Sequence, residues 1–158
     1  MCYIEWFSWR LGVGCHAIEL KAPGKKVAMV QSTTEPWRGL RVLVAEDNVL
    51  IGDFIRQILL GAGCNVVGPF EDLEKALEAI RLEQIDGALL DLELDGVSVL
   101  PAAIALAERN IPFIVASGRA GTADLPPLLG GAPFLPKPFD AARLERFVHG
   151  AFSPRCAA

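Results

Sequence analysis

Four apolar runs in the sequence each end in a residue that could take part in chemistry. Two of the runs end in acids, one ends in a hydroxyl and one ends in an amine. In chain order these residues are Glu46 with Asp47, then Asp91, Ser117 and Lys137. Carboxylate oxygens are the ligands that Mg²⁺ prefers, and a cation beside an ammonium group stabilises a transferring phosphoryl group. The set therefore indicates a site for a divalent cation and a phosphoryl group.

Apolar segments of strand length alternate with helical patterns from residue 40 onward. Strands are predicted at 41–45, 64–68, 86–91, 111–116 and 133–135. Strands that alternate with helices predict an α/β fold, here a doubly wound (βα)5 parallel sheet of five strands. Ligands bind at the carboxyl ends of the strands in such sheets, so the polar residues are expected to meet at one edge.

Periodicity predicts which side of each helix faces the core. Asn48 and Asp140 are expected to cap the first and last helices. The predicted inward residues are Ile51, Phe54, Ile55, Ile58 and Leu59; Leu73, Ala76, Leu77 and Ile80; Leu100, Ile104 and Ala107; and Leu144, Phe147 and Val148.

The segment 119–131 departs from this pattern. It contains Gly121, Pro126, Pro127, Gly130 and Gly131. Each interior glycine costs about 1 kcal/mol and each interior proline about 3 kcal/mol relative to alanine. The fourth helix is therefore expected to be irregular or shortened, with at most one turn near 123–125 or 128–129.

Composition excludes several classes of function. The net charge of the 158 residues is −4 and no basic patch stands out, which argues against nucleic-acid binding. No apolar run reaches the ~18 residues of a membrane span. The four cysteines lack metal-binding spacing, which favours reduced thiols in a cytoplasmic protein.

Three regions are predicted along the chain. Residues 1–38 lack periodicity and are interpreted as a disordered or non-native N-terminal extension, with Met29 as an alternative start. A membrane-touching or partner-binding segment around Trp6 remains a second interpretation. Residues 39–152 form the folded domain, and 153–158 form a tail with no room for an output domain.

The ordered set of strand ends resembles the CheY-like receiver domain of two-component response regulators, over residues 40–150. The resemblance implies a flavodoxin-like fold in which Asp91 accepts a phosphoryl group from the phosphohistidine of a histidine kinase. It also implies that Mg²⁺ is held by Glu46, Asp47, Asp91 and the backbone carbonyl of Glu93.

The same resemblance assigns roles to the remaining site residues. Lys137 would neutralise charge on the phosphoryl oxygens, and Ser117 would hydrogen-bond one of them after transfer. Phe134 stands at the position of the aromatic switch residue, whose ring fills the space that the hydroxyl residue vacates.

Two local features qualify the resemblance. Residues 112–118 resemble the Pro-Phe-x-Phe-Ala-Thr-Gly motif of a subgroup of single-domain receivers, with Val115 and Ser117 as departures. Glu93 and Arg119 lie two residues beyond Asp91 and Ser117. One hypothesis is that they set the lifetime of the phosphoryl group, either by forming an ion pair or by competing with the water that would hydrolyse it. The alternative is that they are two solvated side chains.

Four functions compete. The first is a phosphorylation-switched receiver, monomeric or weakly dimeric, that regulates a protein effector. The second is a phosphate sink for a kinase, and the third is a phosphorylation-independent interaction scaffold. The fourth, a free-standing phosphatase, is disfavoured because Glu93 stands where such enzymes carry a second aspartate. No turnover of a free substrate is expected, so the chain is not expected to be an enzyme.

Overall fold

The computed structural model describes residues 38–118 and 125–152. The main sheet contains β1 (Arg41–Ala45), β2 (Asn65–Phe70), β3 (Gly87–Asp91), β6 (Phe113–Ser117) and β7 (Phe134–Pro136). The helices are α1 (Val49–Gly61), α2 (Leu73–Leu82), α3 (Leu100–Glu108), α4 (Pro127–Gly130) and α5 (Ala141–Phe152). A separate antiparallel pair consists of β4 (Glu93–Leu94) and β5 (Val97–Ser98).

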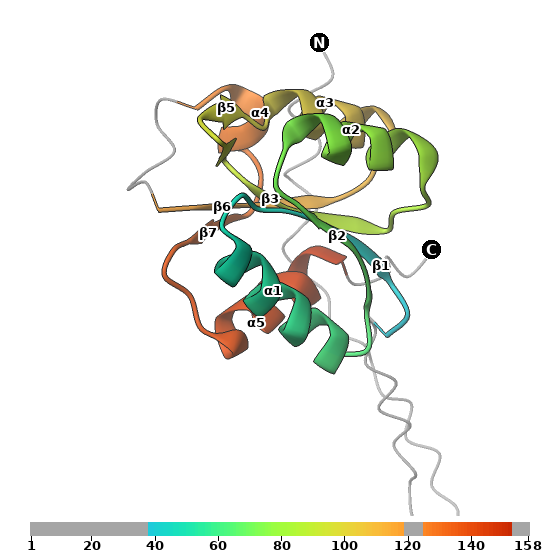
Figure 1. Ribbon diagram of the computed structural model, residues 1–158, viewed down its shortest axis with the longest axis vertical. Coiled ribbons are helices and arrows are strands. Elements are labelled where there is room, and N and C mark those ends of the chain that lie inside the picture. Colours follow the sequence, from blue (N-terminus) through green and yellow to red (C-terminus); the bar gives the residue numbers. More distant parts are fainter. Residues whose placement is uncertain (1–37, 119–124, 153–158) are drawn as a thin grey trace, which may run out of the picture. The chain divides into compact units, whose positions relative to one another are not determined.

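The five strands of the main sheet are parallel and lie in the order β2-β1-β3-β6-β7. Helices α2 and α3 cover one face of this sheet, and α1 and α5 cover the other (Figure 1). The predicted doubly wound α/β fold is therefore confirmed. The strand order changes direction between β1 and β3, which is where sheets of this kind bind ligands.

The inner strands are apolar along nearly their whole length because helices cover both faces. Alternate residues point to opposite faces. Leu43 and Leu90 belong to the cluster under α2 and α3, whereas Val44 and Leu89 belong to the cluster under α1 and α5. All four side chains are buried.

Both predicted helix caps are present. The side chain of Asn48 accepts hydrogen bonds from the backbone N–H groups of Leu50 and Ile51, at 3.1 and 3.2 Å. The side chain of Asp140 accepts one from the N–H of Arg143 at 2.7 Å. These bonds satisfy donors that a helix N-terminus leaves without partners.

The predicted inward face of α3 is wrong at Ile104, whereas Leu100 packs against the core as predicted. Ile104 was assigned to the core, but its side chain is 44% exposed, and Ala103 and Leu106 are buried instead. Helix α3 is apolar on most of its circumference, so a stripe of 3.6-residue spacing can be drawn along more than one side. Phe54 of α1 is also more exposed than predicted, and its ring contacts that of Phe139.

Proline and glycine shape two elements, the edge strand β2 and the short helix α4. Strand β2 runs through Pro69 to Phe70, two residues beyond its predicted end, because an edge strand tolerates a residue without an N–H. Helix α4 is a single turn, as expected for the fourth helix, at the second of the two predicted places.

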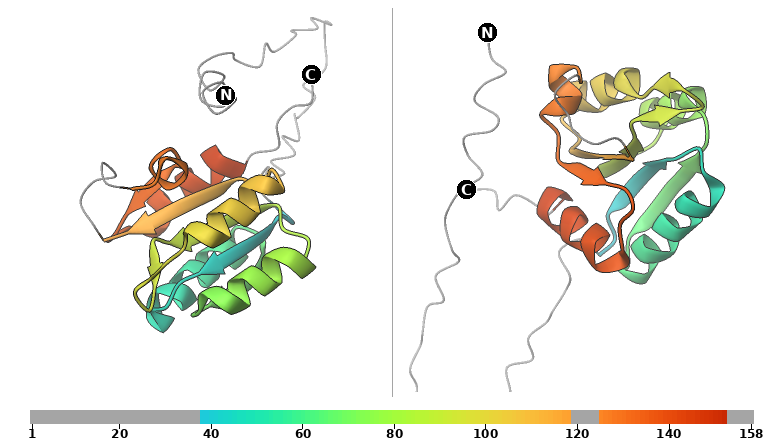
Figure 2. Two further views of the ribbon diagram at one scale, coloured as in Figure 1. Left: turned by 90° about the horizontal axis from the view of Figure 1, so that it is seen from above. Right: turned by 90° about the vertical axis from the view of Figure 1, so that its left-hand side faces the viewer.

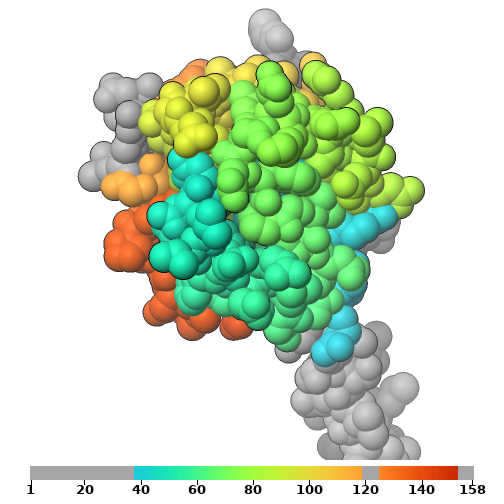
Figure 3. All heavy atoms as spheres, viewed as in Figure 1, coloured from blue at the N-terminus to red at the C-terminus, as the bar shows by residue number. Residues whose placement is uncertain are grey.

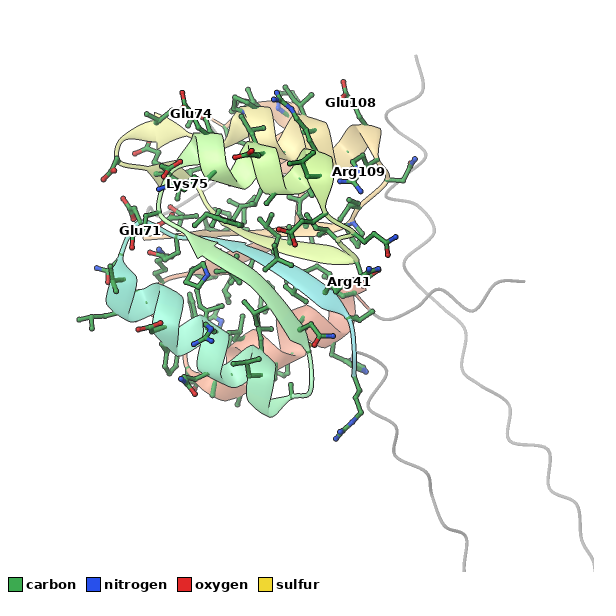
Figure 4. The ribbon with its side chains drawn as sticks, turned by 45° about the vertical axis from the view of Figure 1, so that its right-hand side comes forward. Arg41, Glu71, Glu74, Lys75, Glu108 and Arg109 are labelled. Atoms are coloured by element: carbon green, nitrogen blue, oxygen red, sulfur yellow. The ribbon has the colours of Figure 1, made fainter. Side chains whose placement is uncertain are left out.

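The amino ends of β1 and β3 are joined by side chains. The guanidinium of Arg41 donates to both carboxylate oxygens of Asp86, at 3.0 and 3.1 Å, and its backbone N–H donates at 2.9 Å. Arg109, after α3, donates to the carbonyl of Glu83. Figure 4 shows Arg41 and Arg109 at one end of the sheet, and Glu71 and Lys75 at the other.

Some predictions concern residues outside the described ranges. The extension proposed for residues 1–38 lies there except for its last residue, and so does the tail at 153–158. No helix in the described ranges is long and apolar enough to cross a membrane.

Candidate functional site

Five of the predicted site residues lie at the carboxyl ends of strands or directly after them. Glu46 and Asp47 come directly after β1, Asp91 is the last residue of β3, Ser117 is the last of β6, and Lys137 follows β7. The strands run parallel and in register, so these ends lie along one edge of the sheet, where the arrowheads of β1 and β6 both point (Figure 2). The structure therefore brings the five residues to the same edge.

Lys137 is in direct contact with two of the acids. Its Nζ lies 2.5 Å from Oδ2 of Asp91 and 2.6 Å from Oε2 of Glu46. Only 15% of its side chain is exposed. Hydrogen bonds to charged groups of this kind are short and stronger than neutral ones, so the ammonium links β7 to the carboxylates that follow β1 and β3.

Glu46 is the more deeply buried acid, with 1% of its surface exposed. Its backbone N–H donates to the carbonyl of Phe70 at 2.9 Å. That contact depends on Gly68, which has a φ of +101° and whose Cβ, if present, would lie 2.7 Å from the carbonyl oxygen of Val44. A side chain at residue 68 would therefore disturb the pairing that holds Glu46 in place.

For both Glu46 and Lys137, burial and the contacts with opposite charges shift the pKa in opposite directions. Burial raises the pKa of the Glu46 carboxyl, and the hydrogen bond from Lys137 partly offsets the rise. Burial lowers the pKa of Lys137, but its hydrogen bonds to Asp91 and Glu46 outweigh that effect and raise the pKa above its usual value. Lys137 therefore stays protonated and contributes a positive charge to the site.

Asp47 lies nearer to solvent than Glu46. Its Oδ2 accepts a hydrogen bond from the backbone N–H of Asp95 at 3.0 Å. One carboxylate oxygen from each of Glu46, Asp47 and Asp91 lies within 4.8 Å of the other two. Beside them is a cleft of about 260 Å³, whose lining includes Asp47, Asp91, Leu92, Glu93, Gly96, Ser117 and Gly118.

The three carboxylates could hold a hard divalent cation. Three carboxylates and one ammonium leave two negative charges, which such a cation would neutralise. Oε1 of Glu46 is buried and accepts no hydrogen bond from the described residues. A buried oxygen without a donor is costly, and a cation between the acids would satisfy it. The donor set therefore fits a metal ion such as Mg²⁺.

The two predicted switch residues lie on adjacent strands. Ser117 is 3% exposed and lines the cleft. Its carbonyl accepts the backbone N–H of Lys137 at 2.8 Å. Phe134 starts β7, pairs with Val115 of β6 and packs, partly buried, against the cluster under α2 and α3. The structure thus places a hydroxyl at the cleft and an aromatic ring on the neighbouring strand.

The structure describes only one of the two residues, Glu93 and Arg119, that were predicted to tune the lifetime of the phosphoryl group. Glu93 lines the cleft, and its predicted roles in metal binding and in phosphoryl lifetime stay predictions. Arg119 lies outside the described residues, so the ion pair suggested for the two side chains stays a prediction.

One element of the site was missed from the sequence, namely the β4–β5 hairpin between β3 and α3. Its signal was present, because Asp95-Gly96 between apolar residues favours a two-residue hairpin turn.

Comparison with known proteins identifies the family. Residues 42–149 match the family described as the response regulator receiver domain. The chain belongs to this family. As a receiver it is 30% identical over 111 residues to YrkP of Bacillus subtilis (strain 168), an uncharacterized transcriptional regulatory protein. The match covers 68% of this chain and 47% of YrkP, so the receiver spans about half the length of that relative.

Solved receivers share its fold. The response regulator PhyR from Brucella abortus is 26% identical, with a TM-score of 0.63 over 74% of this chain and 50% of PhyR. The receiver domain of the sensor histidine kinase PA1611 from Pseudomonas aeruginosa PAO1 was solved with a magnesium ion in its active-site cleft. It is 24% identical, with a TM-score of 0.59 over 70% of this chain and 94% of that one, a likeness of fold alone.

Proposed function

We propose that this receiver is controlled by phosphorylation of Asp91, with a histidine kinase as the donor and Mg²⁺ as the cofactor. The observation that carries the proposal is the contact of Lys137 with both Asp91 and Glu46, beside three carboxylates whose oxygens lie within 4.8 Å. Glu46 and Asp47, with Asp91, would hold the metal. The magnesium ion in the PA1611 receiver, and the buried Glu46 oxygen without a donor, support this choice.

Phosphoryl transfer to Asp91 exchanges one bond to phosphorus for another. A carboxylate oxygen of Asp91 attacks the phosphorus of a phosphohistidine, an O–P bond forms and the N–P bond breaks. The imidazole keeps the electron pair of that bond and takes up a proton. Mg²⁺, when bound, supplies positive charge to the phosphoryl oxygens. Lys137 supplies a further positive charge, and only 15% of its side chain is exposed to solvent.

Both oxygens of Asp91 are held before any donor arrives. Oδ2 accepts from Lys137 at 2.5 Å, and Oδ1 accepts from the backbone N–H of Leu92 at 2.6 Å. A carboxylate has about four lone-pair sites, so each oxygen keeps an acceptor site. The nucleophile is therefore oriented toward the cleft, and the protein contributes positioning rather than a separate base.

Under this proposal the chain is a phosphoprotein and not an enzyme that turns over a free substrate. Each transfer consumes Asp91 until the acyl phosphate is hydrolysed. A kinase partner and the buried reduced thiol of Cys64 fit a cytoplasmic location. We place the chain in the subgroup of single-domain receivers with the Phe-Ala-Thr-Gly-type motif on the similarity of residues 112–118.

A switch is favoured over a phosphate sink by the contact between β6 and β7. The carbonyl of Ser117 accepts the N–H of Lys137, and Phe134 pairs with Val115 two residues before Ser117. A shift of Ser117 toward a phosphoryl group would therefore move the backbone beside Phe134, and a protein effector could read that change.

Transfer is tested by incubating the protein with acetyl phosphate and Mg²⁺ and measuring its intact mass. We expect one added phosphoryl group in the wild type and none in Asp91→Asn, while the matched control Asp86→Asn, at the opposite end of β3, still gains it. Equal labelling of Asp91→Asn would reject the assignment. Switching is tested with beryllium fluoride: amide resonances of Ser117 and Phe134 should shift together, whereas a sink requires no change at Phe134.

A further inference from the structure

The β4–β5 hairpin is closed by a two-residue turn. Glu93 pairs with Ser98 and Leu94 pairs with Val97, which leaves Asp95 and Gly96 at the tip. Both have positive φ angles, 49° and 77°. Two central residues with positive φ characterise the type I′ turn, for which Asp-Gly is a favoured sequence. The hairpin thus has a defined conformation.

The hairpin is anchored in the core by the residue that precedes its turn. Leu94 is 1% exposed and belongs to the cluster under α2 and α3. The backbone N–H of Val99 donates to the carbonyl of Leu92 at 3.1 Å, which closes the segment just outside the paired residues. Val97, by contrast, is 52% exposed. The tip is therefore held at a fixed place relative to the end of β3.

The tip meets the functional site at Asp47. The N–H of Asp95 donates to Oδ2 of Asp47 at 3.0 Å across 48 positions of the sequence. Gly96 and Glu93 also line the cleft beside Asp91. A donor that occupies one lone-pair site of a carboxylate restricts its rotation and leaves the other sites for a cation.

We infer that the β4–β5 hairpin is a positioning element for the metal-binding carboxylate of Asp47, with the backbone N–H of Asp95 as the positioning donor. The inference rests on the proposed function, because it assumes that Asp47 binds Mg²⁺. Hydrogen bonds from residues beyond the ligands fix ligand orientation in metal sites, and removing such a partner lowers metal affinity by about 10- to 100-fold.

The test compares two glycines. Gly96→Ala puts a side chain at a φ of +77°, and Gly39→Ala puts one at +86°, and neither new Cβ would have an atom within 4 Å. Both substitutions therefore strain the backbone without a clash, but only Gly96 lies in the hairpin turn. Mg²⁺ is titrated into isotopically labelled protein, cleft amide resonances give the dissociation constant, and the melting temperature reports folding.

We expect Gly96→Ala to weaken Mg²⁺ binding by about 10-fold, the lower end of that range, and Gly39→Ala to leave it unchanged. If the wild type binds Mg²⁺ and Gly96→Ala binds it equally well, the hairpin inference is overturned and the proposed function stands. If the wild type does not bind Mg²⁺, both are overturned.

Amide exchange provides a second measurement that needs no change in the hairpin. The Asp95 N–H should exchange more slowly in the wild type than in Asp47→Ala, where its acceptor is absent, while the amide of Val99 should exchange at the same rate in both. Equal exchange at Asp95 in the two proteins would contradict the inference.

Discussion

The ammonium of Lys137 lies 2.5 Å from the carboxylate of Asp91, at the carboxyl edge of the sheet. The same nitrogen contacts the almost fully buried Glu46. One ammonium group therefore offsets the charge of two carboxylates. A substitution at Lys137 should change both the stability of the fold and the rate of phosphoryl transfer.

Lys137→Met should destabilise the fold because it leaves the buried Glu46 without its partner. Breaking a buried ion pair by removing one member costs about 3–5 kcal/mol, and we expect the lower part of that range because Lys137 retains some exposure. Urea unfolding measures the change. Adding Glu46→Gln removes the unpaired charge, so the double variant should be more stable than Lys137→Met alone. A double variant no more stable than the single one would show that the Glu46 charge is not what Lys137 compensates.

Leu50→Asp should impair transfer from a kinase without impairing transfer from acetyl phosphate. Leu50 is 81% exposed in the first turn of α1, and Figure 3 shows α1 at the surface. Val49 and Phe54 of the same helix are also exposed, and contiguous exposed apolar patches mark sites of protein contact. An acid is also favourable at a helix N-terminus, so folding should not suffer. We expect kinase-dependent transfer to fall about 10-fold, the effect of losing 1.4 kcal/mol of binding.

The matched control for this variant is Leu82→Asp. Leu82 is 76% exposed but lies at the far end of α2, near the amino ends of the strands. It should accept phosphoryl groups from both donors at the wild-type rate. Equal losses in the two variants, or a loss with acetyl phosphate as well, would place the kinase contact elsewhere.

Gly87→Ala should destabilise the domain through α5. A Cβ at residue 87 would lie 2.8 Å from the ring of Phe152, which packs over the start of β3. Overpacking of this kind costs about 1–3 kcal/mol. Gly61→Ala, whose Cβ would meet nothing within 4 Å, is the control and should not destabilise. Chemical denaturation checks both, and Phe152→Leu combined with Gly87→Ala should recover part of the loss. Wild-type stability in Gly87→Ala would contradict the packing described for α5.

The ion pair between Arg41 and Asp86 should make stability depend on pH. The hydrogen bond from Arg41 holds the pKa of the Asp86 carboxyl below its usual value. Because the folded pKa is the lower one, this stabilisation is present above the unfolded pKa of about 3.9 and is lost as the pH falls through the folded pKa. The melting temperature of Asp86→Asn should therefore lie below that of the wild type at pH 7, and the difference should shrink toward pH 3. A constant difference would show that Asp86 does not titrate in this way.

The site could be predicted from the sequence because each of its residues closes a strand. An acid after a fully apolar run, as at Asp91, has few structural explanations, and parallel strands bring such ends together. The shortened α4 was equally predictable, because proline and glycine restrict the backbone directly.

Other features depend on tertiary contacts that periodicity does not report. Helix α3 is apolar on several sides, so only packing decides that Leu106 and not Ile104 is buried. The N–H of Asp95 donates to Asp47 across 48 positions of the sequence. Every residue except proline has a backbone N–H, so the residue types do not reveal which of them donates. The turn at Asp95-Gly96 itself could have been found, since its sequence is typical of hairpins.

Reductive trapping identifies the residue that carries the phosphoryl group, which we propose is Asp91. The protein is phosphorylated with Mg²⁺ present, treated with borohydride, which reduces an acyl phosphate of aspartate to homoserine, and then mapped by peptide mass spectrometry. We predict homoserine at position 91 with Mg²⁺ and none when EDTA removes the metal. Homoserine at another aspartate, or none at position 91 in folded protein with Mg²⁺ and a phosphoryl donor, would show that Asp91 is not the phosphoryl acceptor.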